Sequence, residues 1–95
     1  MNINDSYIIS DKDEEAVKVV HPKNGKNFKL NELRPIVGGH IEIAESKLPG
    51  LIIVLDEEGK LKKKPINKLA TAMYKYGKDD PICGQVLICK TLNII

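Results

Sequence analysis

The chain has 95 residues and a formal net charge of +2, which suits one small domain with a single hydrophobic core. This charge is too small to indicate nucleic-acid or membrane binding, and no apolar run reaches the roughly 18 residues of a membrane-spanning helix. The N-terminus is acidic and does not resemble a secretion signal, so we expect the protein to begin at Met1 and to remain in the cytoplasm.

The charges are distributed unevenly along the chain. Residues 1–15 contain five acidic residues and one lysine, whereas residues 60–78 contain seven lysines and no acidic residue. We predict that residues 1–15 form an acidic arm that folding does not require, and that residues 16–95 form the domain. An alternative stays open, because Tyr7, Ile8 and Ile9 could add a strand at the edge of the sheet.

A β-hairpin and a helix are predicted at the start of the domain. Residues 16–21 are rich in valine, and Asn24-Gly25 supplies the positive φ angles of a tight turn, so we expect a second short strand at residues 26–29. Residues 30–37 have apolar side chains at helical spacing, and the following Gly38 can end this helix in a left-handed conformation.

Two strands are predicted in the middle of the chain. In the first, which alternates, Ile41 and Ile43 are expected to face the core while His40 and Glu42 face the opposite side. Residues 51–55 are apolar at every position, which is typical of a central strand that is covered on both faces.

The last third of the chain is predicted to hold a turn, a helix and a final strand. Gly59 is expected to adopt the left-handed conformation in a polar turn, and residues 82–89 form the apolar last strand. Between them, an amphipathic helix capped by Asn67 should turn these residues inward: Ile66, Leu69, Ala70, Met73 and Tyr76. The sequence therefore predicts an α+β domain of order β-β-α-β-β-α-β, with two helices and a small, mostly antiparallel sheet of about five strands.

The two cysteines fall within the predicted last strand. Cys83 and Cys89 are six residues apart, a span of about 20 Å in a strand, whereas a disulfide needs Cα atoms about 4.4–6.8 Å apart. We therefore expect both thiols to be reduced and buried.

A series of short motifs runs along residues 16–90 in a fixed order: VKVVHPKNGK, VGG with HIEI, EEGKL, PIN and DPICGQVLI. In these motifs the chain resembles the domain of unknown function 3846, a family of small proteins carried by phages and plasmids. The acidic arm, and Asp56 where asparagine is common, depart from the family pattern. The resemblance implies a phage or mobile-element setting and no particular activity.

A basic segment followed by a helix start is the main candidate for a binding site. Lysine ammonium groups attract phosphate as point charges, and the amides at a helix start would add directional donors. A solvated basic loop is the alternative interpretation. The candidate residues are Lys60, Lys62, Lys63, Lys64 and Asn67.

Other polar groups are weaker candidates for a ligand site. His40 and Glu42 share one strand face and could supply two metal ligands, but a structural zinc needs about four, so we expect no bound metal and no cofactor. Glu58 lies in an acidic turn with Asp56 and Glu57, where crowding could raise a pKa or hold a cation, or where the carboxylates are solvated. No serine or cysteine has the setting of an activated nucleophile, so we do not expect an enzyme.

These observations favour a small accessory binding protein. In the setting that the resemblance implies, our first hypothesis is a homo-oligomer that sequesters a phosphate-bearing small ligand, such as a nucleotide signal of host immunity, between its subunits. The second hypothesis is a protein inhibitor or adaptor that docks a host protein through the acidic arm or a sheet edge. A nucleic-acid-binding regulator that uses the basic segment is the third.

Overall fold

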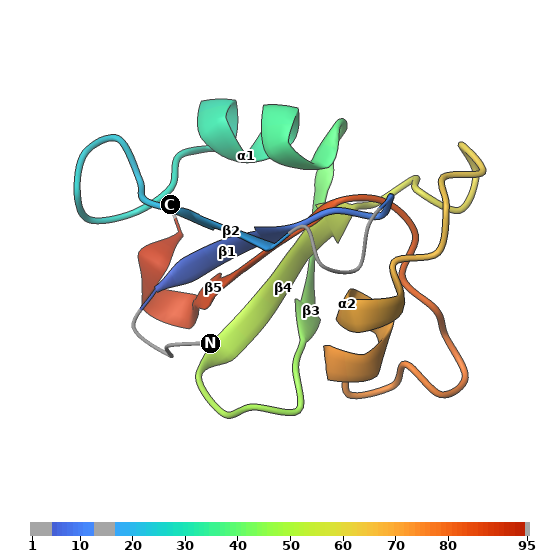
Figure 1. The fold of residues 1–95 in the computed structure, drawn as a ribbon. Coiled ribbons are helices and arrows are strands. Elements are labelled where there is room, and N and C mark those ends of the chain that lie inside the picture. The colour runs from blue at the N-terminus through green and yellow to red at the C-terminus, as the bar shows by residue number, and fades with distance from the viewer. Residues whose placement is uncertain (1–4, 13–16, 95) are drawn as a thin grey trace.

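The computed structural model describes residues 5–12 and 17–94. Within these residues, a five-stranded antiparallel sheet has the order β2-β1-β5-β4-β3 (Figure 1). The predicted α+β class and the predicted order of elements are confirmed. The strands are β1 (Ser6–Ile9), β2 (Val17–Val20), β3 (Ile41–Glu45), β4 (Leu51–Asp56) and β5 (Val86–Lys90); the helices are α1 (Leu30–Val37), α2 (Lys68–Met73) and the short 3-10 helix η1 (Thr91–Asn93).

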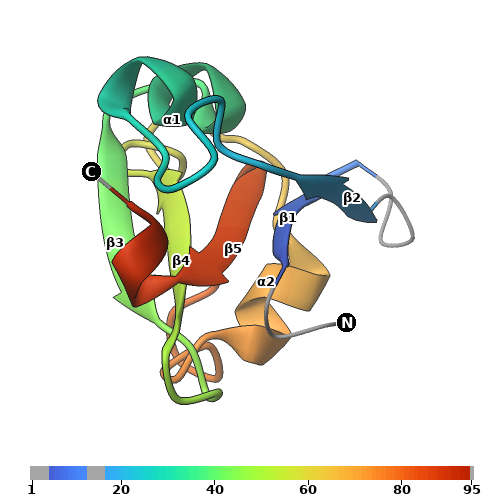
Figure 2. The ribbon, with the colours of Figure 1, turned by 90° about the vertical axis from the view of Figure 1, so that its left-hand side faces the viewer.

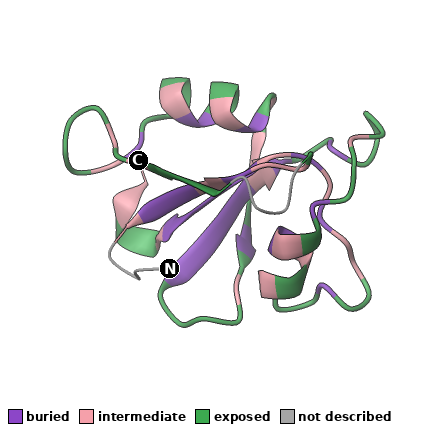
Figure 3. Cartoon of the chain, in the orientation of Figure 1, coloured by how far each residue is buried: buried purple, intermediate pink, exposed green. Residues whose placement is uncertain are grey.

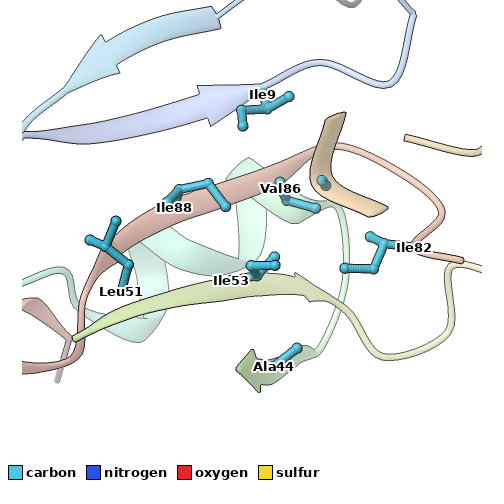
Figure 4. Packing of buried hydrophobic residues seen from close by; sticks show 8 residues of the cluster. Ile9, Ala44, Leu51, Ile53, Ile82, Val86 and Ile88 are labelled. Atoms are coloured by element: carbon cyan, nitrogen blue, oxygen red, sulfur yellow. The ribbon is translucent and has the colours of Figure 1, made fainter. Parts of the chain in front are cut away.

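The two α-helices lie on opposite faces of the sheet, so the central strands are covered on both sides (Figure 1). Side chains of β4 and β5 alternate between two apolar clusters, which explains why residues 51–55 are apolar at every position. The cluster on the α2 face, seen in Figure 4, contains Ile9, Ala44, Leu51, Ile53, Ala70, Ile82, Val86 and Ile88. The cluster on the α1 face contains Phe28, Leu33, Val37, Ile52, Val54, Leu87 and Cys89.

The first strand of the sheet lies within the predicted acidic arm. β1 pairs with both β2 and β5, and Tyr7 and Ile9 are only 7% and 0% exposed. The apolar residues of this segment therefore form an interior strand, where the sequence suggested an optional edge strand. Residues 1–4 and 13–15 of the predicted arm, and the predicted domain start at residue 16, lie outside the described residues.

The predicted hairpin between residues 16–21 and 26–29 is wrong. β2 pairs back with β1, and residues 26–29 contain only an isolated bridge from Phe28 to Ile94. The turn itself forms, with Gly25 at a φ of 75°, but the Asn24 side chain accepts hydrogen bonds from the amides of Lys26 and Asn27 at 2.8 and 2.9 Å. These local bonds occupy amides that a strand would need for its ladder, so the chain continues as a loop toward α1.

Both predicted helix boundaries at Gly38 and Asn67 are confirmed. Gly38 has a φ of 81° and its amide donates to the carbonyl of Arg34, while the Asn67 side chain accepts from the Ala70 amide. α2 is shorter than predicted, because extended backbone at Tyr74 ends it and bridges to Ser46. Ile66 precedes α2 and Tyr76 follows it, so neither is on the inner face of the helix. Both side chains are exposed, and their predicted inward positions are wrong.

The predicted orientation of β3 is only partly right. Ile41 packs against the cluster on the α1 face, but Ile43 is 49% exposed, and Ala44 is buried on the other face. β3 is an edge strand, and α1 packs over β4 and β5 in the centre of the sheet, so the helix leaves Ile43 uncovered.

The last strand begins later than predicted and contains only one of the two cysteines. Cys89 is buried in β5, whereas Cys83 precedes the strand and is partly exposed. Both thiols are free, as expected, but the prediction that both are buried is wrong for Cys83. Burial raises the pKa of Cys89 to about 12.

Candidate functional site

Two lysines of the basic segment fold back onto a buried carboxylate. Asp56 ends β4 and its side chain is fully buried, with the Nζ atoms of Lys62 and Lys64 at 2.8 and 2.7 Å from Oδ2. The same ammonium groups donate to the carbonyls of Gly38 and Val37, at 3.1 and 2.9 Å. Cations at the C-terminus of a helix are stabilised by the helix dipole, so these lysines also hold the end of α1.

Glycines make room for this cluster of Asp56, Lys62 and Lys64. A Cβ atom on Gly39 would lie 2.6 Å from Nζ of Lys62 and 2.7 Å from Oδ1 of Asp56. Gly59 is not in the left-handed conformation that the sequence predicted; instead, a Cβ there would lie 2.5 Å from the carbonyl oxygen of Cys83. These glycines of the shared motifs therefore serve close packing between segments that are distant in the sequence.

The charge of Asp56 is stabilised by its partners. Burial alone would raise the pKa of Asp56, but hydrogen bonds from Lys62 and Lys64 and from the Glu58 amide outweigh burial and lower the pKa to about 2. The first carboxylate of the acidic turn is therefore an internal ion-pair partner, and its pKa is lowered, where the sequence suggested that crowding could raise a pKa.

The predicted phosphate-binding residues do not converge on one open surface. Asn67 is buried, and its side-chain Nδ2 donates to the carbonyls of Ile9 and Gly84, both at 3.0 Å. Lys60 pairs with Asp80. Lys63 is exposed, with a positive φ of 56°. The side chain of Asn67 thus links β1, the start of α2 and the segment before β5 by hydrogen bonds.

A hollow of about 180 Å³ lies on the α2 face, beside β3. It brings together Glu42 and Lys60 from the predicted set, while His40 and Glu58 are exposed and do not line it. The hollow is lined by Glu42, Ala44, Leu55, Asp56, Glu57, Lys60, Tyr74, Asp80, Pro81, Ile82 and Cys83. Glu42 and the turn that begins at Asp56 were weaker candidates from the sequence, but no motif indicated that they would meet Tyr74 and Asp80 here.

The hollow is acidic. Lys60 and Asp80 neutralise each other, whereas Glu42 and Glu57 are exposed and have no ionic partner among the residues that the structure describes. Within residues 5–12 and 17–94, no group of three histidine, cysteine or acidic side chains is placed to hold a metal ion. The predicted pair of His40 and Glu42 accordingly gains no third ligand in this part of the chain.

The free edge of β3 borders this hollow. At the end of the strand, the Glu45 carbonyl accepts from the Lys75 amide and the Lys47 amide donates to the Met73 carbonyl, so these groups point away from β4. Backbone groups alternate along an antiparallel strand, so those of Ile41 and Ile43 point to the same outer side. Figure 2 shows β3 at the left-hand border of the sheet.

The described residues form a small α+β domain with a helix on each face of the sheet and an open edge strand next to an acidic hollow. The chain belongs to the family of the Domain of unknown function (DUF3846), whose model matches residues 5–93. The match begins before β1, so from residue 5 onward the predicted acidic arm is part of the family domain. No curated protein and no solved structure matches the chain significantly. None of the helices in the described residues is long and apolar enough to cross a membrane.

Proposed function

We propose that this protein acts without catalysis, by binding another polypeptide that docks as an additional strand on the free edge of β3. The observation that carries the proposal is the outward direction of the backbone groups of Ile41 and Ile43 on an edge strand. An unpaired edge is a template for another extended chain, and several protein modules recognise peptides in this way.

The surroundings of this edge support docking. Met73–Lys75 cover β3 only at Glu45–Lys47, and the Ile43 side chain is 49% exposed beside the open part. An added strand would therefore gain main-chain hydrogen bonds from the edge and apolar contact with Ile43. β2 is the other edge of the sheet and is exposed in Figure 3. The hollow, with two carboxylates that are unpaired in the described part of the chain, lies beside β3, so we place the proposal on β3.

This proposal favours the inhibitor or adaptor role over the phosphate-binding role. The ammonium groups of Lys62 and Lys64 are held by Asp56, and Asn67 is buried, so a phosphate would have to displace internal partners. The phage setting implied by the sequence motifs fits an inhibitor of a host protein. Sequestration of a phosphate ligand and assembly into a homo-oligomer stay predictions.

A peptide library displayed on phage tests the docking site. Ile43→Pro removes the outward-facing amide from an edge strand, where proline is tolerated, while Ile43→Thr keeps the amide and a β-branched side chain. We expect peptides selected on the wild type to bind the threonine variant and to lose binding to the proline variant. Selected peptides that bind the folded proline variant as tightly as the wild type would contradict docking at β3.

A further inference from the structure

We propose that the strand that docks on β3 carries a lysine or arginine opposite Glu42, with an apolar residue on each side of it. This inference rests on the proposed docking at β3 and specifies the chemistry of the partner. The observations behind it are the alternation of side chains along β3 and the two carboxylates, Glu42 and Glu57, at the acidic hollow.

The pairing geometry sets which partner residue meets the hollow. Residues directly opposite each other in neighbouring strands place their side chains on the same face, with Cβ atoms about 4.5–5.5 Å apart. Glu42 lines the hollow on the α2 face, so the partner residue opposite Glu42 points to the hollow. Partner residues opposite Ile41 and Ile43 point to the α1 face, where the half-exposed Ile43 side chain offers an apolar contact.

The charges around the hollow select a cation for that position. Lys60 is paired with Asp80, and Asp56 is paired with two lysines, so that cluster keeps one positive charge. The negative charges of Glu42 and Glu57 have no partner in the described chain and outweigh it by one. A lysine or arginine head group would donate hydrogen bonds to these carboxylates, and charge-assisted bonds of this kind are among the stronger ones.

The size of the hollow fits the end of a long side chain. Its volume of about 180 Å³ is below the roughly 300–1,000 Å³ of typical pockets for drug-sized ligands. Tyr74 lines the hollow, and an aromatic ring near a bound cation would add attraction. The phosphates of a nucleotide would be repelled by the carboxylates of Glu42 and Glu57.

A second copy of this chain that pairs in the register centred on Glu42 fits the edge less well than a basic peptide. If two β3 strands paired symmetrically about Glu42, the two Glu42 side chains would lie opposite each other, and like charges in that position are destabilising. The partner that complements this edge is therefore an extended segment with the pattern apolar–basic–apolar.

Three synthetic peptides test the inference by calorimetry at low salt. All have alternating valine and threonine around a central position that holds lysine, glutamine or glutamate. We expect the lysine peptide to bind the wild type about tenfold more tightly than the glutamine peptide, because it adds a charge-assisted contact. Glu42→Gln should remove most of this preference, and Glu42→Lys should shift it to the glutamate peptide. Glu58→Gln is the matched control and should leave the preference unchanged, because Glu58 is exposed but does not line the hollow.

The outcomes separate the inference from the proposed docking. Equal binding of the lysine and glutamine peptides, with both lost in Ile43→Pro, would overturn the basic specificity and leave docking at β3 intact. Equal binding of a peptide to the wild type and to Ile43→Pro would overturn the docking itself, as would failure of all three peptides to bind the wild type at millimolar concentration.

Discussion

Replacement of Asp56 by alanine should destabilise the protein far more than replacement of an exposed ion-pair partner. The fall in the pKa of Asp56 from 3.8 to about 2 corresponds to about 2 kcal/mol of stabilisation of the charged form in the folded protein. The substitution also removes the acceptor of the Glu58 amide, which lies 2.9 Å from Oδ1. Lys62 and Lys64 are 40% and 23% exposed and can turn partly into water, so the loss should be about 2–3 kcal/mol, below the cost of stranding fully buried charges.

Urea unfolding followed by circular dichroism measures this loss, and Glu45→Ala is the control. Glu45 pairs with Lys75 at 3.1 Å, but both side chains are exposed, so this variant should lose at most about 0.5 kcal/mol. If Asp56→Ala were as stable as Glu45→Ala, the cluster of Asp56, Lys62 and Lys64 would not fasten residues 57–64 to the end of α1, as the geometry implies.

Three further predictions follow from burial and charge. The pKa of Asp56 is lowered on folding, so its contribution to the free energy of unfolding is complete above about pH 4 and is lost toward pH 2. Stability measured as a function of pH should show this loss in the wild type and not in Asp56→Asn. Identical pH profiles of the two proteins would contradict the prediction. A chain that starts at Ala16 lacks β1 and should fail to fold, as judged by amide dispersion in NMR spectra; a well-dispersed spectrum would show that β1 is dispensable, as the sequence first suggested. A thiol reagent should modify Cys83 faster than Cys89, because Cys89 is buried with a raised pKa; equal rates in the folded protein would contradict the packing of β5.

Features that depend on local sequence were predictable. The apolar run at residues 51–55 indicated a central strand, Gly38 indicated the end of a helix, and Asn67 indicated the start of another. In each case the deciding interaction lies within a few residues of the chain, or the pattern alone reports burial on both faces.

Features that depend on partners distant in the sequence were not predictable. Ser6–Ile9 is short and lies among acidic residues, and only its pairing with β5, far away in the sequence, makes it an interior strand. Similarly, a run of lysines has the same pattern whether it is solvated or folded onto a buried carboxylate, so the contacts of Lys62 and Lys64 with Asp56 leave no local sign.

The way in which residues come together at the hollow beside β3 was also not predictable from the local sequence. Its carboxylates come from β3, from the end of β4 and the turn after it, and from the loop before β5, and Tyr74 follows α2, so no single motif in the sequence indicates the hollow. Glu42 was singled out because it shares a strand face with His40, and in the structure it lines the hollow while His40 does not.

Hydrogen exchange of the β3 amides, measured by NMR with and without the lysine peptide, tests the docking proposal most directly. The amides of Ile41 and Ile43 point to the free edge, whereas those of Glu42 and Ala44 already face β4. We predict that bound peptide slows exchange at Ile41 and Ile43 and leaves Glu42 and Ala44 almost unchanged. If saturating peptide left exchange at Ile41 and Ile43 unchanged and instead slowed exchange in β2 or in residues 60–64, docking on the β3 edge would be contradicted.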